Sequence, residues 1–402
     1  MNRIWRQLAI ASNWPILVAV LVLTAIGIVS IQAHSGADPH AAADAKKQLL
    51  FAAIGFGVML AMQAVSYLAI GRFAWPFYIL SLASLIYTVM PGVPTGAFLG
   101  VPEIKGQRNW INAGPLKLQP AELMKVAFCM VMARYLRFRS NYRTLGGLIP
   151  PFLLAVVPLM VILKQPDLGT AILFIPALFA MLFVAGARLR HLLAIVGIGL
   201  VLMPIAWYSG PREDTGLDIE VPILKHLPAL VKKYQRARVY SLFSRDPAIL
   251  RNTGYQQEQA VTAFGSGGFS GKGALNIPVG RTVPEAHNDM VFALIGEQFG
   301  FIGAVVTLAA YLVLFTTGVE IAANTREPFG KLVAVGTVSL LAGQTFMNIM
   351  VAQRLMPVTG ITLPFVSYGG SSLLASFIAA GLLLNIGQNR PLVMANDAFE
   401  FD

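Results

Sequence analysis

The chain has 402 residues, of which 56% are hydrophobic and only 12% are charged. Because soluble domains carry about a quarter charged residues, this composition excludes an ordinary soluble protein and indicates one that is embedded in lipid. The formal net charge of +11 could indicate nucleic-acid binding, but the cations mostly lie between apolar runs and no recognition motif accompanies them. Anionic headgroups and substrates explain the charge better, and we expect no nucleic-acid partner.

Apolar windows of about 20 residues, the length that crosses a bilayer, recur about ten times. Their approximate ranges are 14–33, 48–68, 73–91, 119–136, 145–163, 168–186, 190–208, 290–316, 331–353 and 366–388. The first is longer than the apolar core of a signal peptide, so we predict an uncleaved anchor. The sequence therefore predicts an all-α polytopic membrane protein with about ten transmembrane helices, residues 1–402 forming one integral membrane domain.

Cations are more frequent in one set of short connections than in the other, which predicts that both termini lie in the cytoplasm. One connection, from about 209 to 289, is far longer and lies between the seventh and eighth windows on the opposite side. Loops above about 15 residues are usually functional or disordered. This loop has too many apolar segments for disorder, including 221–224, 240–243 and 261–264. We expect short amphipathic helices on the outer face.

Several motifs resemble ligand sites but lack required residues. The glycine-rich segment 265–273 has Ser266 and Gly273 where a Walker A loop needs glycine and then serine or threonine. Ser371 lacks the trailing glycine of a nucleophile elbow. The five histidines show no metal-ligand spacing, and the single cysteine, Cys129, leaves no disulfide or thiolate metal site. We therefore predict no nucleotide site and no metal held by the protein.

Four polar clusters fall on the outer side of the predicted topology. They are residues 106–125, 164–170, 254–259 and 357–372. Each has a structural alternative: Glu122 suits the start of a helix and can pair with Lys125, and Asp167 suits a turn or cap. The third can be a surface helix, and the small residues of the fourth can permit close helix packing. Together the clusters favour a headgroup site, because they gather cations, amides and an aspartate on one face.

Asp289 stands at the mouth of the apolar helix that opens at Met290. Acids at the membrane edge usually have a partner, a capping role or a chemical task. As an N-cap, Asp289 would contribute about 1 kcal/mol. In a partly desolvated site with a raised pKa it could instead act as a general base. The residue types alone leave both open, as they leave Glu297, two turns further along, either structural or part of the same polar track.

Motifs along nearly the whole chain, in order, resemble the SEDS family, the family of RodA, FtsW and SpoVE. They are Gln119–Glu122 with Lys125, Gln165–Thr170, Gly254–Gln256 with Gln259, Gly265–Gly273, Pro284–Asp289, Asn348–Ile349, Pro357–Gly360 and Leu363–Ser372. Short terminal tails favour the RodA type. Three positions depart from the family pattern. Asn288 replaces a threonine, Asn109 rather than Arg108 precedes Trp110, and Arg354 replaces a glycine.

The resemblance implies a peptidoglycan glycosyltransferase that polymerises lipid II at the outer face of the bacterial cytoplasmic membrane. It further implies a class B penicillin-binding protein as partner, within the elongation or division machinery, and polyprenyl tails in apolar grooves between helices. The catalytic aspartate of the family carries over to Asp289, which we expect to act as base in an inverting transfer. The other expected substrate contacts are Lys125, Lys117, Arg108, Lys272, Glu122, Gln119, Asp167, Gln256, Gln259, Glu285, His287, Ser367 and Ser371.

The cations expected to contact the diphosphate are Lys125 and Lys117 first, and Arg108 and Lys272 second. A divalent cation such as Mg²⁺ or Mn²⁺ can accompany the substrate. Two alternatives remain. A lipid-precursor flippase or transporter would use the same polar groups as a path to the cytoplasmic side. A polyprenyl-linked O-antigen polymerase or ligase would share the composition but carry different motifs.

Overall fold

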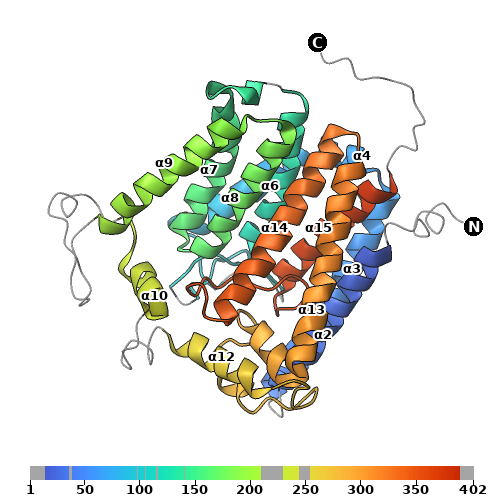
Figure 1. Cartoon of the computed structure of the whole chain (residues 1–402), viewed down its shortest axis with the longest axis vertical. Coiled ribbons are helices and arrows are strands. Elements are labelled where there is room, and N and C mark those ends of the chain that lie inside the picture. The colour runs from blue at the N-terminus through green and yellow to red at the C-terminus, as the bar shows by residue number, and fades with distance from the viewer. Residues whose placement is uncertain are drawn as a thin grey trace, which may run out of the picture.

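The computed structural model describes residues 14–35, 39–96, 98–104, 106–114, 116–139, 141–209, 230–243 and 254–389. Both terminal tails, on which the predicted orientation partly depends, lie outside these ranges. Helices dominate, and Figure 1 shows them packed side by side as an elongated bundle. The all-α polytopic class predicted from the apolar windows is confirmed.

Eight helical stretches of the described chain are long and apolar enough to cross a membrane. They belong to helices α2 (Trp14–Ser35), α3 (Pro39–Ala61), α7 (Ile149–Lys164), α8 (Leu168–Ala185), α9 (Leu189–Tyr208), α13 (Val291–Asn324), α14 (Pro328–Ala352) and α15 (Gly370–Gln388). Two other predicted windows coincide with α5 (Ala74–Val89) and α6 (Pro120–Arg137). Helix α5 is shorter, and α6 carries four charged residues, so ten spans remain a prediction.

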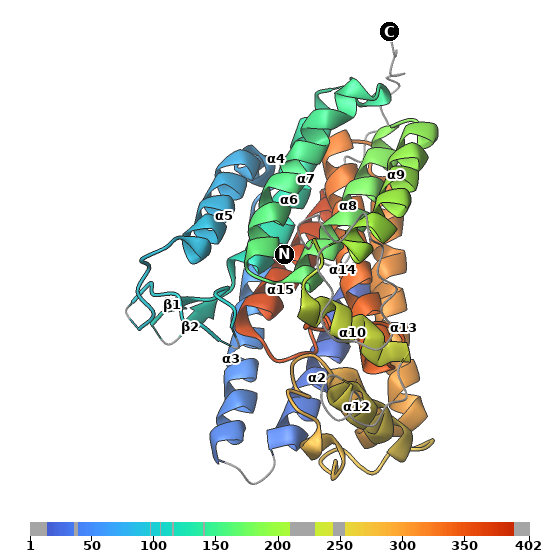
Figure 2. The ribbon, with the colours of Figure 1, turned by 90° about the vertical axis from the view of Figure 1, so that its left-hand side faces the viewer.

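The remaining elements lie mostly at the ends of the bundle. A short hairpin, β1 (Ile111–Ala113) and β2 (Leu116–Leu118), precedes α6, and α4 (Tyr67–Arg72) precedes α5. The long loop contributes α10 (Lys233–Phe243) and α12 (Tyr255–Ser266), which are two of the helices expected there. Its apolar segment 221–224 lies outside the described residues. Figure 2 shows α12, the end of α2 and the start of α3 at one end of the molecule, and α4 toward the other.

Short 3₁₀ turns complete the connections. They are η1 (Met62–Ala64), η2 (Asn141–Arg143), η3 (Gly146–Leu148) and η4 (Gly280–Thr282). The turn η1 separates α3 from α4, and η2 and η3 lie between α6 and α7.

Helix α13 is broken at Gly300, where φ is +62° and ψ −159°. The glycine-rich segment 265–273 wraps this kink: the Phe301 N–H donates to the Gly268 carbonyl at 2.9 Å, and a Cβ on Gly300 would lie 2.4 Å from the Gly271 nitrogen. Only glycine tolerates both the dihedral angles and this approach. The eighth apolar window therefore forms two helical segments rather than one straight helix. They meet at Gly300, where the surrounding loop leaves room only for a glycine.

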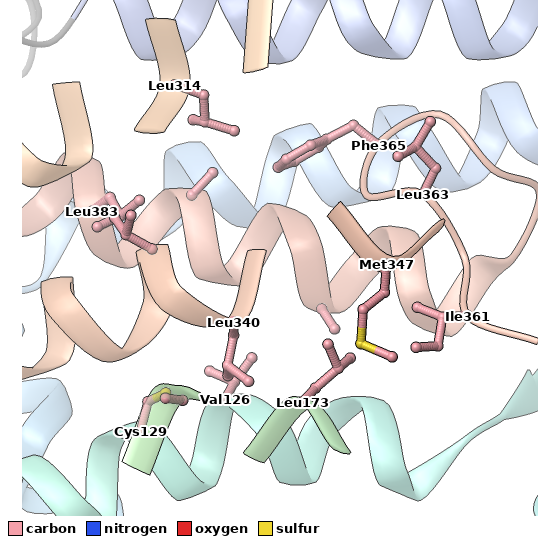
Figure 3. Packing of buried hydrophobic residues seen from close by; sticks show 14 of the residues in the cluster. Val126, Cys129, Leu173, Leu314, Leu340, Met347, Ile361, Leu363, Phe365 and Leu383 are labelled. Atoms are coloured by element: carbon pink, nitrogen blue, oxygen red, sulfur yellow. The ribbon is translucent and has the colours of Figure 1, made fainter. Parts of the chain in front are cut away.

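The apolar core lies between α6, α8, α13, α14 and α15. Val126, Leu173, Leu340 and Met347 pack together there, and Figure 3 shows them beside the loop that joins α14 to α15. Of the apolar window in α15, 83% is buried, against 6% in α9. The α14–α15 loop is thus held by the best-packed helices of the bundle, which fixes the polar groups that it carries.

Candidate functional site

The loop between α14 and α15, residues 353–369, holds the turn that carries Asp289. Ser367 makes two bonds: its Oγ accepts from the Leu363 N–H at 2.7 Å and donates to the Asn288 carbonyl at 2.6 Å. The Tyr368 N–H donates to the His287 carbonyl at 2.9 Å. Positive φ values at Gly360 and Phe365 turn the loop sharply. Two segments far apart in the sequence are therefore joined by direct hydrogen bonds.

Asp289 is partly exposed and lies at the bend of this loop. Its backbone carbonyl accepts from Asn348 Nδ2 at 2.8 Å, and the same amide donates to the Ile361 carbonyl at 2.7 Å. A Cβ on Gly360 would lie 3.7 Å from Asp289 Oδ2, so the carboxylate rests against the glycine. The N-cap position of α13 is Met290, whose side chain forms no capping hydrogen bond. Asp289 thus lies one residue before the N-cap position, and its chemical role stays a prediction.

A buried charge cluster lies on the other side of the same loop. Lys125 Nζ is 3.0 Å from Glu122 Oε2, both side chains are less than 10% exposed, and Lys125 also donates to Gln344 Oε1 at 2.8 Å. Gln344 Nε2 donates to the Thr362 carbonyl at 2.9 Å, and Thr362 Oγ1 lies 2.6 Å from Ser372 Oγ. Glu122, Lys125 and Gln344 line a pocket between α6, α14 and α15.

Gln344 and Asn348 are four residues apart on α14 and therefore share a face of that helix. One amide holds Lys125, the other holds the Asp289 backbone, and both grip the stretch 361–362 of the loop. Neither amide was among the site residues expected from the sequence. Asn348 did stand in a family motif, and two amides one turn apart in an apolar helix are themselves a signal, because buried polar groups need partners.

Asp167 caps α8 beside this charge cluster. Its carboxylate accepts from the Thr170 N–H at 3.0 Å and from Thr170 Oγ1 at 2.8 Å. Burial raises the pKa of Asp167, and the charge of Glu122 raises this pKa further, while the bonds from Thr170 and the charge of Lys125 oppose the shift. Asp167 thus has the capping role that the sequence left open, in a position electrostatically coupled to the Glu122–Lys125 pair.

The residues from β2 to the start of α6 lie against the N-terminus of α15. Ser371 Oγ accepts from the Gln119 N–H at 3.0 Å and donates to the Lys117 carbonyl at 3.0 Å. The Lys117 side chain is exposed. Ser371 is therefore a structural link between two expected site segments, and it leaves Lys117 beside the site with its ammonium in solvent.

His287 and Glu285 support the Asp289 turn. The His287 ring lies 5.0 Å from that of His34 and 5.5 Å from that of Tyr368. Tyr368 Oη donates to Asp44 Oδ1 at 3.0 Å, and both burial and the Asp44 carboxylate raise the pKa of this phenol. Glu285 has φ +53° and accepts from Asn288 Nδ2 at 2.7 Å, so the asparagine that replaces threonine has a polar partner.

Arginines on α10 and after α14 approach the same loop and were not expected from the sequence. Arg238 Nη1 donates to the Val358 carbonyl at 3.0 Å, and Arg354 Nη2 donates to the Ser241 carbonyl at 3.3 Å. Arg354 has φ +57°, a conformation that favours the glycine which the family pattern has there. The signal for Arg238 was the basic run at 232–238, which lies in the long loop.

Other expected residues lie apart from this site or serve the fold. Arg108 Nη2 donates to the Val93 carbonyl at 3.0 Å, and Lys272 is paired with the buried Glu297 at 2.5 Å. Gln256 Nε2 donates to the Pro284 carbonyl at 2.9 Å, while Gln259 is partly exposed on the same helix. Neither Arg108 nor Lys272 forms an ion pair with Asp289. Both cations stay predicted substrate contacts, although each has a structural partner within the described chain.

The geometry can support proton removal by a carboxylate beside fixed positive charge. Asp289 supplies the carboxylate, Lys125 the buried cation and Lys117 an exposed one. Within the described ranges there is no group of three or more histidine, cysteine, aspartate or glutamate side chains arranged to hold a metal.

Comparisons with known proteins agree with this arrangement. The family model for FtsW, RodA and SpoVE, described as a cell cycle protein, matches residues 11–391. A probable peptidoglycan glycosyltransferase FtsW of Geobacter sulfurreducens is 34% identical over 351 residues, covering 85% of this chain and 84% of the relative.

Solved structures are similar over almost the whole chain. A structure described as "Structural coordination of polymerization and crosslinking by a peptidoglycan synthase complex" has a TM-score of 0.74, with 28% identity and coverage of 96% of this chain and 100% of the other. The rod shape determining protein RodA of Thermus thermophilus has a TM-score of 0.64, with 25% identity and coverage of 95% and 99%. The chain is thus a glycosyltransferase that belongs to the FtsW, RodA and SpoVE family.

Proposed function

We propose that this glycosyltransferase polymerises lipid II into glycan strands, with Asp289 as general base. The observation that carries the proposal is the pair of amides on α14. Asn348 fixes the backbone of Asp289 and Gln344 fixes Lys125, so a base and a cation are set against one loop. A reaction that removes a proton and releases a diphosphate needs these two groups at a fixed separation.

The proposed step is a direct displacement. The acceptor hydroxyl oxygen bonds to the anomeric carbon of the donor sugar as the bond from that carbon to the diphosphate breaks. The hydroxyl proton passes to the Asp289 carboxylate, and the anomeric centre is inverted. Diphosphate is a good leaving group once its charge is matched, so one carboxylate suffices where a glycosidase needs two.

Lys125 and Lys117 are the cations proposed to receive the departing diphosphate. Lys117 is exposed beside the N-terminus of α6, and Lys125 lies one turn inside that helix. Lys125 is itself paired with Glu122, but that pair borders a pocket. Lys272 is instead paired with Glu297, which accepts from three further donors, and Arg108 donates to a carbonyl, so the first two lysines are favoured. A divalent cation, Mg²⁺ or Mn²⁺, would arrive on the diphosphate of the substrate and neutralise it further.

We propose that the site faces the outer side of the bacterial cytoplasmic membrane, with both termini inside, because cations favour the opposite connections. A class B penicillin-binding protein is the proposed partner, since a similar solved structure is described as coordinating polymerization with crosslinking. The elongation machinery is our preferred setting, supported by the similarity to the rod shape determining protein RodA. The division machinery is the alternative, supported by the relatives named FtsW.

The test is synthesis of glycan strands from labelled lipid II by the purified protein with its partner. Replacing a general base lowers the rate by about 10²- to 10⁴-fold, so Asp289→Asn should lose at least the lower figure while keeping its thermal stability. Asn288→Thr, which restores the residue typical of the family, is the matched control and should stay active. No polymer from wild type, or equal polymer from Asp289→Asn, would contradict the proposal.

The same preparation tests the flippase alternative. Wild type that moves lipid II across vesicles without joining sugars, and loses that transport in Asp289→Asn, would support a transporter. We favour polymerisation because the described polar clusters gather around one loop rather than along a path through the bundle.

A further inference from the structure

An open apolar groove lies between α5 and α7, far from Asp289. Trp75, Tyr78 and Leu82 of α5 form one wall, Leu153 and Val157 of α7 the other, and the empty volume is about 690 Å³. Tyr135, from the last turn of α6, closes the floor at one end. Figure 2 shows α5 beside α6 and α7, with α4 next to the N-terminal end of α5.

A proline in α7 leaves one backbone carbonyl beside the groove without its helical partner. Pro158 has no N–H, so the Leu154 carbonyl four residues earlier has no helical partner. The Tyr78 hydroxyl supplies the missing bond at 2.8 Å across the two helices. Trp75 packs edge-on against the Tyr78 ring, with 6.4 Å between centroids, and stays 39% exposed. The groove therefore offers no unpaired polar backbone group here, and its open side is lined by apolar side chains.

Two exposed arginines lie close to residues that line the groove. Arg72 precedes Trp75 by three residues, and the Arg139 guanidinium lies 5.7 Å from the centre of the Tyr135 ring. Neither forms an ion pair with a described carboxylate. By contrast, Arg137, two residues before Arg139, is 2.9 Å from Glu327. Within the described part of the chain, the apolar groove thus has beside it two cations that form no ion pair.

We propose that this groove binds an anionic phospholipid, with one acyl chain along α5 and α7 and the phosphate between Arg72 and Arg139. The apolar lining of the groove suits a hydrocarbon chain, and the two cations suit a phosphodiester. A neutral zwitterionic lipid would fill the groove but gain little from the arginines. A second protein helix would leave both arginines without a counterion, unless it brought its own acids.

Trp75 makes the proposal measurable. In a variant whose only tryptophan is Trp75 (Trp5, Trp14, Trp110 and Trp207 each changed to Phe), brominated acyl chains quench its emission on contact. The protein is placed in vesicles of mixed phosphatidylcholine and phosphatidylglycerol, with bromine on only one of the two lipids at equal mole fraction. We expect several-fold stronger quenching when the bromine is on phosphatidylglycerol.

Arg72→Gln and Arg139→Gln should each lower that preference by about fivefold, the effect of about 1 kcal/mol per cation at a membrane surface. Val157→Phe, which fills the groove, should abolish it while keeping both arginines. Arg188→Gln with Arg190→Gln is the matched control, since this pair lies on the α8–α9 connection near Arg143, at the same end of the bundle. Equal quenching by both lipids in wild type, or an unchanged preference in the two arginine variants, would overturn the proposal.

Discussion

Two buried glutamate–lysine pairs in this protein have opposite surroundings. The Glu297 carboxylate accepts from four donors: Lys272 Nζ, Ser266 Oγ and the N–H groups of Val279 and Gly280. The Glu122 carboxylate accepts from Lys125 alone among the described residues, and it borders a pocket. The first pair is saturated and ties the glycine-rich segment to the kink of α13. In the second pair the Glu122 carboxylate can accept further hydrogen bonds, as a group that contacts a substrate must.

The largest effect should come from the unsaturated pair. Lys125→Met leaves Glu122 buried without its cation, and breaking a buried pair in this way costs about 3–5 kcal/mol of unfolding free energy. The double variant Glu122→Gln/Lys125→Met removes the stranded charge and should regain most of that stability. Its rate of glycan synthesis should still fall at least about 100-fold, because the diphosphate has lost a fixed cation. Thermal unfolding in detergent and lipid II polymerisation measure the two effects, and an active double variant would remove Lys125 from the mechanism.

The saturated pair should behave differently. Glu297→Gln removes the charge that four donors share, and charge-assisted hydrogen bonds contribute about 1.5–3 kcal/mol each, so a stability loss of that order is expected. Glu297→Gln/Lys272→Met should not recover it, because the N–H groups of Val279 and Gly280 each use one carboxylate oxygen, and a glutamine offers only one acceptor oxygen to the two of them. Activity per folded molecule should stay near wild type. A folded variant without activity would instead place Lys272 in the substrate site, as its charge first suggested.

The sequence predicts the positions of the helices well because apolar windows depend only on local composition. All ten windows coincide with helices. The break at Gly300 was not predicted, because it depends on the packing of Gly267 and Gly271 against the backbone of α13. No local signal identifies that contact across about 30 residues of chain.

The site was predicted in part for the same reason. Glu122 and Lys125 are three apart on one helix, so their pairing follows from helical geometry. Lys272 and Glu297 are 25 residues apart and are joined by a loop, so no regular helical or strand spacing predicts their contact. Asn348 and Gln344 were not among the predicted site residues, because an uncharged amide gives no electrostatic signal in the sequence. Both nevertheless lie in an apolar helix, where polar groups need partners.

A smaller effect is expected at the amide that fixes the turn of Asp289, the proposed base. Asn348→Ala removes the donor to the Asp289 carbonyl but leaves the carboxylate in place. A misplaced base lowers kcat, with an expected loss of about 10- to 100-fold and little change in KM. The matched control is Gln257→Ala, another buried amide that donates to two carbonyls, those of Val351 and Met356. The control should lose stability alone, and a similar fall in kcat in both variants would mean that Asn348 acts only through folding.

The smallest effect is expected at Asp167, where capping and burial oppose each other. Because burial raises the pKa of this carboxyl, the folded state binds the proton more tightly than the unfolded chain does. The stability that this proton contributes is present below the ordinary aspartate pKa of about 4 and is lost as the pH rises through the raised value.

Asp167→Asn keeps the cap on α8 without a charge, so it should unfold at a higher temperature than wild type at neutral pH, and its melting temperature should vary less with pH above 4 or so. Asp167→Ala loses the cap and should be less stable by about 1 kcal/mol. If Asp167→Asn is less stable than wild type at neutral pH, the negative charge of Asp167 is itself needed, and its partner is the nearby Lys125. In that case Asp167, Glu122 and Lys125 form a triad in which one lysine balances two carboxylates. The comparison is then between the saturated Glu297–Lys272 pair and this triad.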